Sequence, residues 1–299
     1  MDKISVVINT LNEEKNLPDL LSSIKDIADE IVIVDMKSDD KTVIIAKNEG
    51  AQVFEHERTN YVEPARNYAI SKAKGKWILI LDADEVFPIG LSKELIRICK
   101  NPKADYYRIP RKNIAFGKWL KHSRWWPDYN IRFFKKGYVS WSEIIHSVPM
   151  TKGNGLDVSD KEEYAIIHNH YQSIEQYIER MNRYTMFQAK HLISEGYRFK
   201  WQDLIKKPMN EFLSRYFFGE GYRDGVHGLV LSFLQSFSEL TVYLKVWQAE
   251  KFKEYNPDLK EVIKVIKESE RELNYWQADT LVKNGGGILQ IIKRKFKLP

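Results

Sequence analysis

Two aspartates, Asp82 and Asp84, stand one residue apart directly after an apolar run, and Glu85 follows them. Carboxylate oxygens are hard ligands that suit Mg²⁺ and Mn²⁺. Such ions commonly take one or two protein carboxylates and complete their shell with water and substrate phosphates. The spacing predicts metal-assisted chemistry on a phosphorylated substrate, although a solvated strand end would show the same residues.

The apolar run before these acids, Trp77-Ile78-Leu79-Ile80-Leu81, predicts a strand buried on both faces of a parallel sheet. Ligands of open α/β sheets bind beyond the carboxyl ends of the strands. Strand geometry would also point Asp82 and Asp84 in the same direction. The sequence therefore predicts that both carboxylates reach one crevice.

Earlier segments repeat the order strand, polar loop, helix. Strands are expected at residues 4–8, 30–34 and 53–55, and helices from Leu17, from Thr42 and over residues 65–70. This alternation implies a parallel sheet with right-handed crossovers. Asn12, Glu13 and Asp35 then lie at the same rim as the aspartate pair.

Several short motifs in this region occur in a recognisable order. They are Ser5-Val6-Val7-Ile8, Asn12-Glu13-Glu14, Ile33-Val34-Asp35, Ser38-Asp39-Asp40-Lys41-Thr42, Ala65-Arg66-Asn67 and Asp82-Ala83-Asp84. Together they resemble the family 2 glycosyltransferases of GT-A fold over roughly the first third of the chain. The resemblance implies an α/β domain that binds a nucleotide diphosphate sugar, with a UDP-sugar as the first expectation.

The resemblance also implies roles for single residues on the nucleoside side. Thr10, Asn12 and Glu13 would lie against the nucleoside, and Asp35 would accept a hydrogen bond from the base. Ser38, in the motif that follows Asp35, is placed in the same donor-binding group.

On the diphosphate side, the resemblance places Arg66 near the base or the diphosphate. Asp82 would contact the ribose and, directly or through water, the metal, while Asp84 would bind the divalent ion that bridges the diphosphate. The Met36-Lys37 pair departs from the family, because relatives usually carry small residues such as Ser-Gly there.

Glycosyl transfer of this kind passes through an oxocarbenium-like transition state, and negative charge builds on the leaving diphosphate. The attacking hydroxyl must lose a proton to a base. The resemblance implies inversion at the anomeric carbon by a single displacement.

Candidates for the base lie in residues 105–150, where basic and aromatic residues alternate in a pattern that suits sugar faces and phosphates. Single-stranded nucleic acid would fit the same pattern less well here. Glu143 and Asp128 are the candidate bases, and His146 is a candidate metal ligand or phosphate donor. The segment around Trp141 and His146 resembles a lipopolysaccharide inner-core subgroup, in which the histidine is commonly followed by Glu, whereas Ser147 stands here.

A second histidine pair, His168 and His170, closes an apolar strand at residues 165–167. Both rings could face the rim of the sheet, and packing against the following helix is an equally good interpretation. Relatives carry a His-Tyr pair that matches His170-Tyr171.

The domain boundary is expected near residue 200, giving a catalytic domain at 1–200 and a helical C-terminal region at 201–299. Ser173 and Gln176 form a capping box that predicts a helix over residues 173–192.

One long helix is expected from an apolar stripe that contains Val226, Val230, Phe233, Phe237, Leu240, Leu244 and Trp247. This helix suits packing on the catalytic domain, a homodimer seam or a membrane surface. Polar residues interrupt it, so a membrane span is not expected.

The last segment, residues 288–297, sets apolar residues beside a basic cluster. It suits an anionic membrane surface, where each Lys or Arg contributes on the order of 1 kcal/mol. It equally suits a solvated helix, because the helix dipole favours basic residues in the last turn.

Bulk composition agrees with an enzyme of anionic substrates. The 299 residues are 43% hydrophobic, which is enough for a core, and the net charge of +6 points to nucleotides, phosphorylated glycolipids or membrane surfaces. Cys99 is the only cysteine, so no intramolecular disulfide forms and a reducing compartment is expected. Met1-Asp2-Lys3 leads straight into the first strand, so no signal peptide is expected.

The sequence thus predicts an α/β, GT-A, metal-dependent, inverting glycosyltransferase. We expect transfer of a hexose, with glucose first, to a saccharide or lipid-linked acceptor of lipopolysaccharide or another cell-surface glycan. The expected location is cytoplasmic, with peripheral contact at the inner face of the membrane, and no nucleic acid is expected as a partner.

A nucleotidyltransferase is the alternative enzyme, although residues 9–15 lack its glycine-rich loop. A basic nucleic-acid or membrane module would leave Asp35, Asp82 and Asp84 unexplained.

Overall fold

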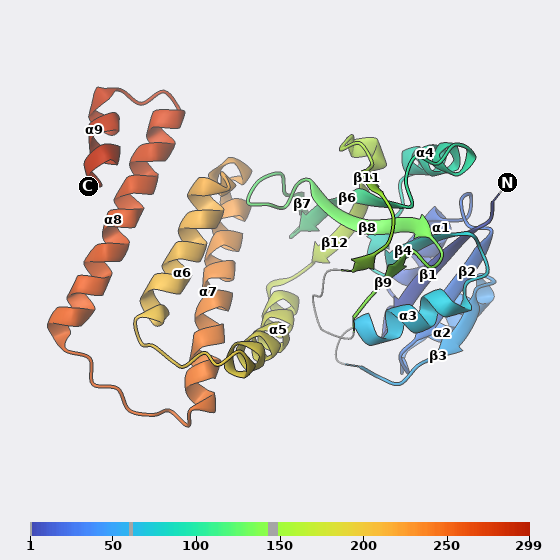
Figure 1. Cartoon of the computed structure of the whole chain (residues 1–299), viewed down its shortest axis with the longest axis horizontal. Helices are drawn as coiled ribbons and strands as arrows, with labels where there is room; N and C mark the ends of the chain where they lie inside the picture. Colours follow the sequence, from blue (N-terminus) through green and yellow to red (C-terminus); the bar gives the residue numbers. More distant parts are fainter. Residues whose placement is uncertain (1, 60–61, 143–148) are drawn as a thin grey trace. The chain divides into compact units, whose positions relative to one another are not determined.

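The computed structural model of the chain describes residues 2–59, 62–142 and 149–299 (Figure 1). Contacts divide the chain into two compact units. Unit 1 comprises Met1–Ile114 and Trp126–His170, and unit 2 comprises Ala115–Trp125 and Tyr171–Pro299. The predicted boundary near residue 200 would keep the helix after Ser173 in the first domain, whereas these contacts group that helix with unit 2.

Unit 1 consists of short strands and helices that alternate at first and then give way to strands. The strands are β1 (Ile4–Thr10), β2 (Glu30–Asp35), β3 (Gln52–Glu55), β4 (Trp77–Asp82), β5 (Glu85–Val86), β6 (Tyr106–Ala115), β8 (Asp128–Lys135), β9 (Val139–Ser140), β10 (Met150–Thr151), β11 (Gly155–Asp157) and β12 (Ile166–Tyr171). The helices are α1 (Leu17–Ser23), α2 (Thr42–Asn48), α3 (Glu63–Lys72), α4 (Ile89–Lys100) and the short 3₁₀ helix η1 (Glu162–Tyr164). The strands and helices predicted within residues 4–82 are all present.

The main sheet of unit 1 has the strand order β3-β2-β1-β4-β8-β6-β12-β5. The first four strands are parallel to one another, as the alternation with helices predicts. β8 then pairs antiparallel with both β4 and β6. The sheet is therefore parallel where the chain alternates and antiparallel where it does not.

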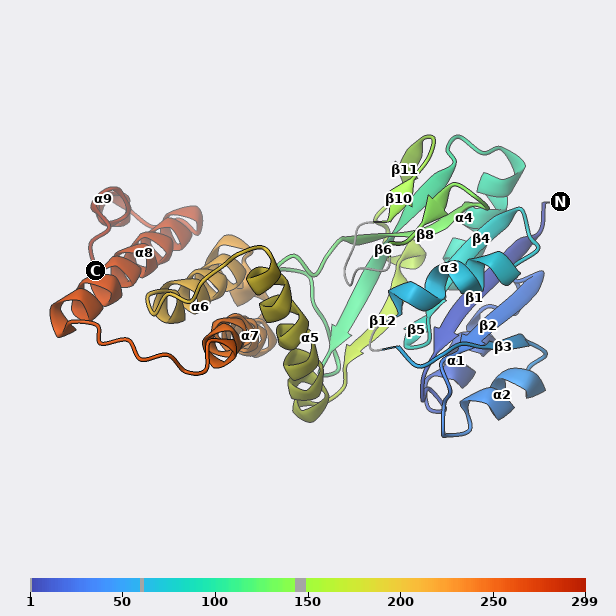
Figure 2. The same ribbon diagram turned by 60° about the horizontal axis from the view of Figure 1, so that its bottom comes forward.

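Helices cover both faces of this sheet because the strands alternate their side chains (Figure 2). On β1, Ile4, Val6 and Ile8 belong to a core cluster shared with α1, α2 and α4. Val7 points to the other face and belongs to a cluster with Ala69 of α3. The apolar run on β4 is buried throughout, which confirms the predicted strand with two covered faces.

The single cysteine lies near the end of α4. Cys99 is 6% exposed and packs in the core cluster beside Leu95 and Ile98. Burial raises the pKa of its thiol to about 12. Cys99 is therefore a neutral, buried side chain in the folded protein.

Unit 2 is mainly helical. Its elements are β7 (Lys118–Trp119), α5 (Ile174–Ser194), α6 (Asp203–Leu213), the π-helical turn η2 (Ser214–Phe218), the 3₁₀ helix η3 (Gly221–Asp224), α7 (Val226–Ala249), α8 (Leu259–Lys283) and α9 (Ile288–Phe296). The Ser173 side chain accepts a hydrogen bond from the Gln176 N–H at 3.2 Å, which confirms the predicted cap of α5.

The long apolar stripe forms one helix, α7, as predicted. It packs against α5 and α6, with Leu231, Val242 and Val246 buried. Within the described residues, α7 is the one helix that is long and apolar enough, by length and composition alone, to cross a membrane. The expectation that α7 does not cross a membrane stays a prediction.

Candidate functional site

The carboxyl ends of the central parallel strands bring the predicted polar residues to one edge of unit 1. Thr10 at the end of β1 is the register partner of Asp35 at the end of β2, and Asn9 is the partner of Asp82 on β4. This confirms that Asp35 and Asp82 share the rim, and it places the loop after Thr10 there too.

Asp35 organises the first part of this rim. Its Oδ1 accepts hydrogen bonds from the Thr10 hydroxyl at 2.9 Å and the Ser38 hydroxyl at 2.6 Å, and its Oδ2 accepts the Ser38 N–H at 2.8 Å. Asp35 is only 3% exposed. Oδ1 accepts two hydrogen bonds and Oδ2 accepts one, so Oδ2 is the oxygen better placed for the base contact that the resemblance implies.

Two loops are joined beside this carboxylate. The Asn12 N–H donates to the Ser38 hydroxyl at 2.8 Å, and the Asn12 side-chain oxygen accepts the Asp39 N–H at 3.0 Å. The Glu13 N–H donates to the Thr42 hydroxyl at 2.8 Å. Asn12 and Glu13 therefore hold the loop after β1 against the loop after β2 and form one ledge at the predicted nucleoside side.

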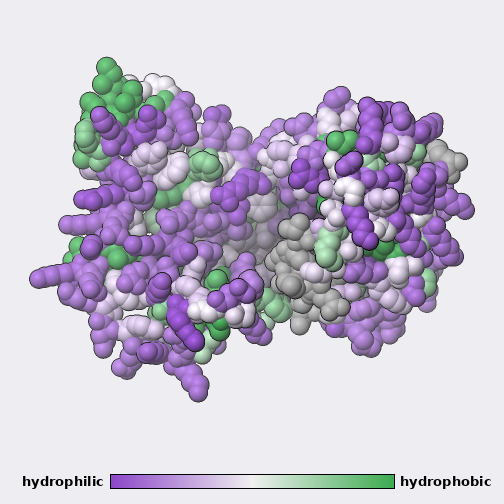
Figure 3. Space-filling model, viewed as in Figure 1, coloured by the Kyte–Doolittle hydropathy of each residue, from purple (hydrophilic) through white to green (hydrophobic). Residues whose placement is uncertain are grey.

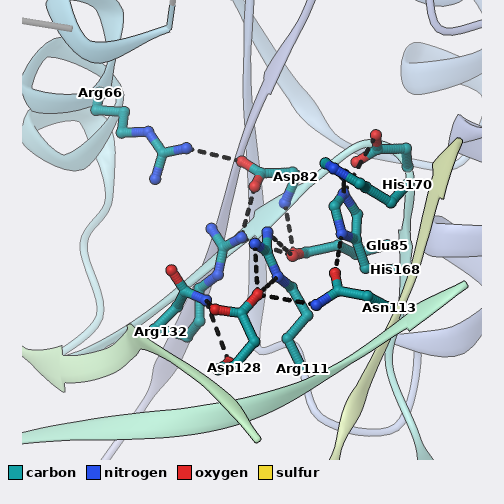
Figure 4. A network of polar contacts seen from close by, with 11 residues as sticks. Arg66, Asp82, Glu85, Arg111, Asn113, Asp128, Arg132, His168 and His170 are labelled. Carbon is teal, nitrogen blue, oxygen red and sulfur yellow. Dashed lines mark hydrogen bonds and ion pairs between the residues drawn. The ribbon is translucent and has the colours of Figure 1, made fainter. Parts of the chain in front are cut away.

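Asp82 lies between two guanidinium groups (Figure 4). Its Oδ1 accepts a hydrogen bond from Arg66 Nη2 at 2.8 Å, and its Oδ2 accepts one from Arg132 Nη2 at 2.5 Å. Burial alone would raise the pKa of this carboxyl, but Arg132 and then Arg66 outweigh it and hold the pKa of Asp82 far below its usual range. The two arginines thus favour the ionised carboxylate of Asp82, and direct metal coordination would compete with them.

Arg66 is itself held in place by its surroundings on α3. Its guanidinium lies over the ring of Trp141, 5.4 Å from the centroid. The neighbouring Asn67 side chain bonds both backbone groups of Trp141, donating to its carbonyl at 2.6 Å and accepting its N–H at 2.9 Å. The segment that carries Trp141 is therefore anchored to the helix that carries Arg66.

A buried network continues inward from Asp82. Arg132 Nη2 also donates to Glu85 Oε1 at 2.6 Å, while Glu85 Oε2 accepts the Asp82 N–H at 2.9 Å. Arg111 lies 3.5 Å from Glu85 and 2.8 Å from Asp128. Burial raises the pKa of Glu85 despite Arg132 and Arg111. Three carboxylates, those of Asp82, Glu85 and Asp128, thus share two arginines, Arg111 and Arg132, in one network below the rim.

Asp128, a candidate base, has both carboxylate oxygens engaged. Oδ2 accepts hydrogen bonds from Arg111 Nε at 2.9 Å and from Asn113 Nδ2 at 3.0 Å, and Oδ1 accepts one from Asn130 at 3.2 Å. Burial raises the pKa of this carboxyl, but Arg111 and the amide donors more than offset it, so the pKa lies below its usual range. This environment makes Asp128 a weak base.

Asp84 does not continue the strand. β4 ends at Asp82, and Asp84 lies in the turn before β5. The prediction that one strand carries both carboxylates and points them in the same direction is therefore wrong. Asp84 Oδ2 instead lies 3.6 Å from His168 Nε2 on β12. His170 Nδ1 lies 3.4 Å from the same His168 nitrogen. His168 therefore contacts Asp84, the residue that follows the rim strand β4 by two positions.

The protonation of His168 follows from its neighbours. Asn113 donates through Nδ2 to Asp128, so its oxygen faces His168 Nδ1 at 2.7 Å and can only accept. This contact favours the neutral tautomer that carries its proton on Nδ1, in which Nε2 presents its lone pair toward Asp84 and His170. Figure 4 shows this chain of contacts from Asp128 through Asn113 to His168.

Four residues of the site were not predicted from the sequence: Arg132, Glu85, Arg111 and Asn113. Arg132 stood in the basic and aromatic run, and Glu85 in the three-carboxylate cluster, so both were visible signals. Arg111 and Asn113 alternate along β6, a pattern that does not identify a partner. The predicted residues Glu143 and His146 lie outside the described residues.

Comparison with known proteins gives consistent results. Residues 5–152 match the model of the family Glycosyl transferase family 2. An uncharacterized glycosyltransferase of Rickettsia typhi is 32% identical over 248 residues, which make up 80% of this chain and 84% of the relative. The lipopolysaccharide core biosynthesis glycosyltransferase LpsC of Rhizobium meliloti is 24% identical over 252 residues, 82% of this chain and 92% of LpsC.

Among solved structures, S. aureus TarS 1–349 in complex with UDP-GlcNAc aligns with a TM-score of 0.46 and 17% sequence identity. The alignment covers 86% of this chain and 94% of that structure.

Proposed function

This chain belongs to glycosyl transferase family 2 and has the GT-A fold, and from that premise we propose that it is an inverting, metal-dependent hexosyltransferase. A glycosyltransferase of this family takes its sugar from a nucleotide sugar. We propose a nucleoside diphosphate hexose as the donor, with UDP-glucose as the first to test. The observation that carries the proposal is the placement of Asp84 beside His168 at the rim that Asp35 and Asp82 share.

The two parts of the donor have separate supports. The ledge of Asn12, Glu13 and Ser38 supports nucleoside binding, because it presents the backbone and short polar groups of two loops at the strand ends. Asp82, kept ionised and fixed by Arg132, suits the ribose hydroxyls as an acceptor. Arg66 would turn toward the diphosphate when the donor enters, since a guanidinium pairs well with phosphate oxygens.

The residues at Asp84 fit a divalent metal. Among the described residues, no three His, Cys, Asp or Glu side chains are already arranged as a metal site. A donor-bound metal needs only one or two protein ligands, because phosphates and water supply the rest. Asp84 Oδ2 and the lone pair of His168 Nε2 are a suitable pair, and when bound the metal would offset the charge that grows on the leaving diphosphate.

The transfer itself needs a base that takes the proton of the attacking acceptor hydroxyl. The acceptor oxygen forms a bond to the anomeric carbon while the bond to the diphosphate breaks, which inverts that centre. Because Asp128 is bound to Arg111, Asn113 and Asn130, we propose Glu143 as the base to test first. His146 is proposed as a donor to phosphate or as a further metal ligand.

For the acceptor we propose a saccharide of a cell-envelope glycan, lipid-linked and of the lipopolysaccharide core type. Two observations support it. The relative from R. meliloti is by its name a lipopolysaccharide core glycosyltransferase, and this chain has a net charge of +6, which suits a phosphorylated glycolipid. Reaction at the inner face of the cytoplasmic membrane is part of this proposal.

The decisive experiment is calorimetry of nucleoside diphosphates and nucleotide sugars with Mn²⁺ or Mg²⁺ and again with chelator. We expect one nucleotide to bind with metal and to lose at least about tenfold in affinity with chelator or in Asp84→Ala, since a removed ligand commonly costs that much. Asp19→Ala, an exposed acid on α1, is the matched control. Binding that ignores both chelator and Asp84→Ala would refute the metal-dependent donor site.

A second readout tests the stereochemistry. For the nucleotide that binds, ¹H NMR of the first product formed gives its anomeric configuration. An inverted product supports the single displacement, whereas a retained one contradicts it. Glu143→Gln should lower kcat without changing donor affinity, because a base acts on the acceptor.

A further inference from the structure

Helix α9 lies on unit 2 with its polar side inward. Arg294 Nη1 pairs with Asp279 Oδ1 of α8 at 3.1 Å, and Lys297, just after the helix, pairs with Glu272 of α8 at 2.6 Å. Asp279 is buried and Lys283 also reaches it, at 2.9 Å. The ion pairs therefore decide which side of α9 faces α8.

The apolar side of α9 is consequently turned to the outside. Its exposed residues are Ile288 (76%), Leu289 (62%), Ile291 (45%), Ile292 (44%) and Phe296 (62%), and Leu298 continues them at 47%. Figure 3 shows hydrophobic side chains gathered over α9. A helix on a globular surface normally buries its apolar side. A patch of this kind marks a surface that meets another apolar phase.

Cations surround the patch. An open groove of about 570 Å³ borders Phe296 and Leu298, and Lys267, Arg271, Lys295 and Lys297 line it together with Glu270. Residues 259–299 contain nine Lys and Arg against five Asp and Glu, a net charge of +4 out of the chain's +6. The apolar patch is thus framed by positive charge.

We propose that α9 is a membrane-surface anchor that lies flat on a bilayer containing anionic lipids. Its apolar side chains would enter the boundary between headgroups and acyl chains, and the groove cations would meet lipid phosphates. The helix has nine residues, about 14 Å at 1.5 Å per residue, so it lies on the bilayer and does not cross it.

A lipid surface fits this patch better than a protein partner does. Six exposed side chains on one short segment are far fewer than the about 20–30 residues that each partner contributes to a stable protein interface. Interface cores are also depleted in lysine, whereas lysines at the edge of an apolar face are favoured on anionic membranes. The inference does not depend on the donor or the acceptor of the proposed reaction.

The test uses the full chain and vesicles of phosphatidylcholine alone or mixed with phosphatidylglycerol. We expect sedimentation with the mixed vesicles and binding at least about tenfold weaker without the anionic lipid. Raising the salt concentration should weaken binding, because it screens the cations. No binding to the mixed vesicles, or equal binding to both kinds, would overturn the proposal.

Matched variants separate the patch from general effects. Leu289→Asp with Ile292→Asp should abolish vesicle binding. Ile89→Asp, at an isoleucine of α4 in unit 1 that is still more exposed (72%), should leave it unchanged. Lys295→Glu should weaken binding to the mixed vesicles without removing an ion pair that positions α9. Equal binding by the double variant and wild type would contradict the proposal even if Lys295→Glu binds less.

Light scattering without lipid tests the competing occupant. A monomer is expected. A dimer that Leu289→Asp dissociates would show that a second copy covers the patch and would overturn the membrane proposal. Nucleotide calorimetry on the same variants should match wild type, so failure of membrane binding and failure of the proposed enzyme function remain distinguishable.

Discussion

The rim of unit 1 and helix α9 depart from the usual distribution of polarity in opposite directions. Just below the rim, Arg132 and Glu85 are ionisable residues with exposures of 3% and 1%. On α9, isoleucines and a phenylalanine face outward while arginine and lysine face the protein. The buried charges have their partners inside the chain, and the exposed apolar side has its proposed partner outside it. Each arrangement is costly unless its partner is present.

The largest effect is expected from breaking the buried side of this comparison. Arg132→Met removes the cation that both Asp82 and Glu85 share. Removing one member of a buried ion pair costs about 3–5 kcal/mol, so the free energy of unfolding of unit 1 should fall by that order in urea titrations. Arg108→Met breaks an exposed pair with Asp157 and should cost no more than about 1 kcal/mol. Equal losses in the two variants would contradict the account of the network.

A second effect concerns the positioning of His168. Asn113→Leu removes the acceptor at His168 Nδ1, so the ring and its tautomer are no longer fixed. Loss of such a supporting contact typically costs about 10–100-fold in metal affinity, which calorimetry of Mn²⁺ with the nucleotide would measure. Asn130→Ala removes a hydrogen bond to Asp128 and none to His168, so it serves as the control. If Asn130→Ala weakens the binding of Mn²⁺ as much as Asn113→Leu does, the position and tautomer of His168 do not explain the loss of affinity.

A smaller effect is expected at acid pH. Arg111 and the amide donors hold the pKa of Asp128 below its usual range in the folded state. The unfolded state therefore binds the proton first as the pH falls below about 4, and stability is lost as the pH falls through the folded pKa. Asp128→Asn should make the loss of stability with acid less steep in urea titrations at several pH values.

In the same experiment, Glu85 should affect the pH dependence of stability in the direction opposite to Asp128. Burial raises the pKa of Glu85, so its ionisation costs stability as the pH rises. The acid slope should not flatten in Glu85→Gln. A flattened slope in Glu85→Gln but not in Asp128→Asn would reverse the assignment of the two carboxylates.

The smallest effect is expected on α9. Leu289→Asp should change the free energy of unfolding by no more than about 0.5 kcal/mol, as exposed substitutions usually do. Leu91→Ala, at a buried position of α4, should cost about 2–5 kcal/mol. A large loss in Leu289→Asp would mean that the apolar side of α9 is packed within the folded chain.

The parallel half of the sheet could be predicted from the sequence because its signals are local. Strand runs, the helix starts at Leu17 and Thr42 and the capping box at Ser173 each lie within a few residues. The shared rim follows from them by topology, since the ends of parallel strands meet at one edge. Asp35 and Asp82 were found in this way.

The rest of the site depends on contacts that the sequence does not encode locally. Arg132 reaches Asp82 across 50 residues, because β8 joins the sheet antiparallel beside β4. His168 reaches Asp84 from β12, and the turn at Asp84 broke the alternation expected of a strand. On α9, the sequence showed apolar residues beside a basic cluster, but only the ion pairs with Asp279 and Glu272 show which side of the helix is turned outward.

The buried thiol of Cys99 has a practical consequence for work on this protein. The neutral thiol of Cys99 lies on α4 and is buried in the core, so it reacts slowly with maleimides, because the thiolate is the reactive form. A cysteine introduced on α9, such as Leu289→Cys, would therefore take up a fluorophore selectively in the native protein, with no need to remove Cys99. Conversely, the rate at which Cys99 becomes labelled in mild denaturant would report how often unit 1 opens around α4.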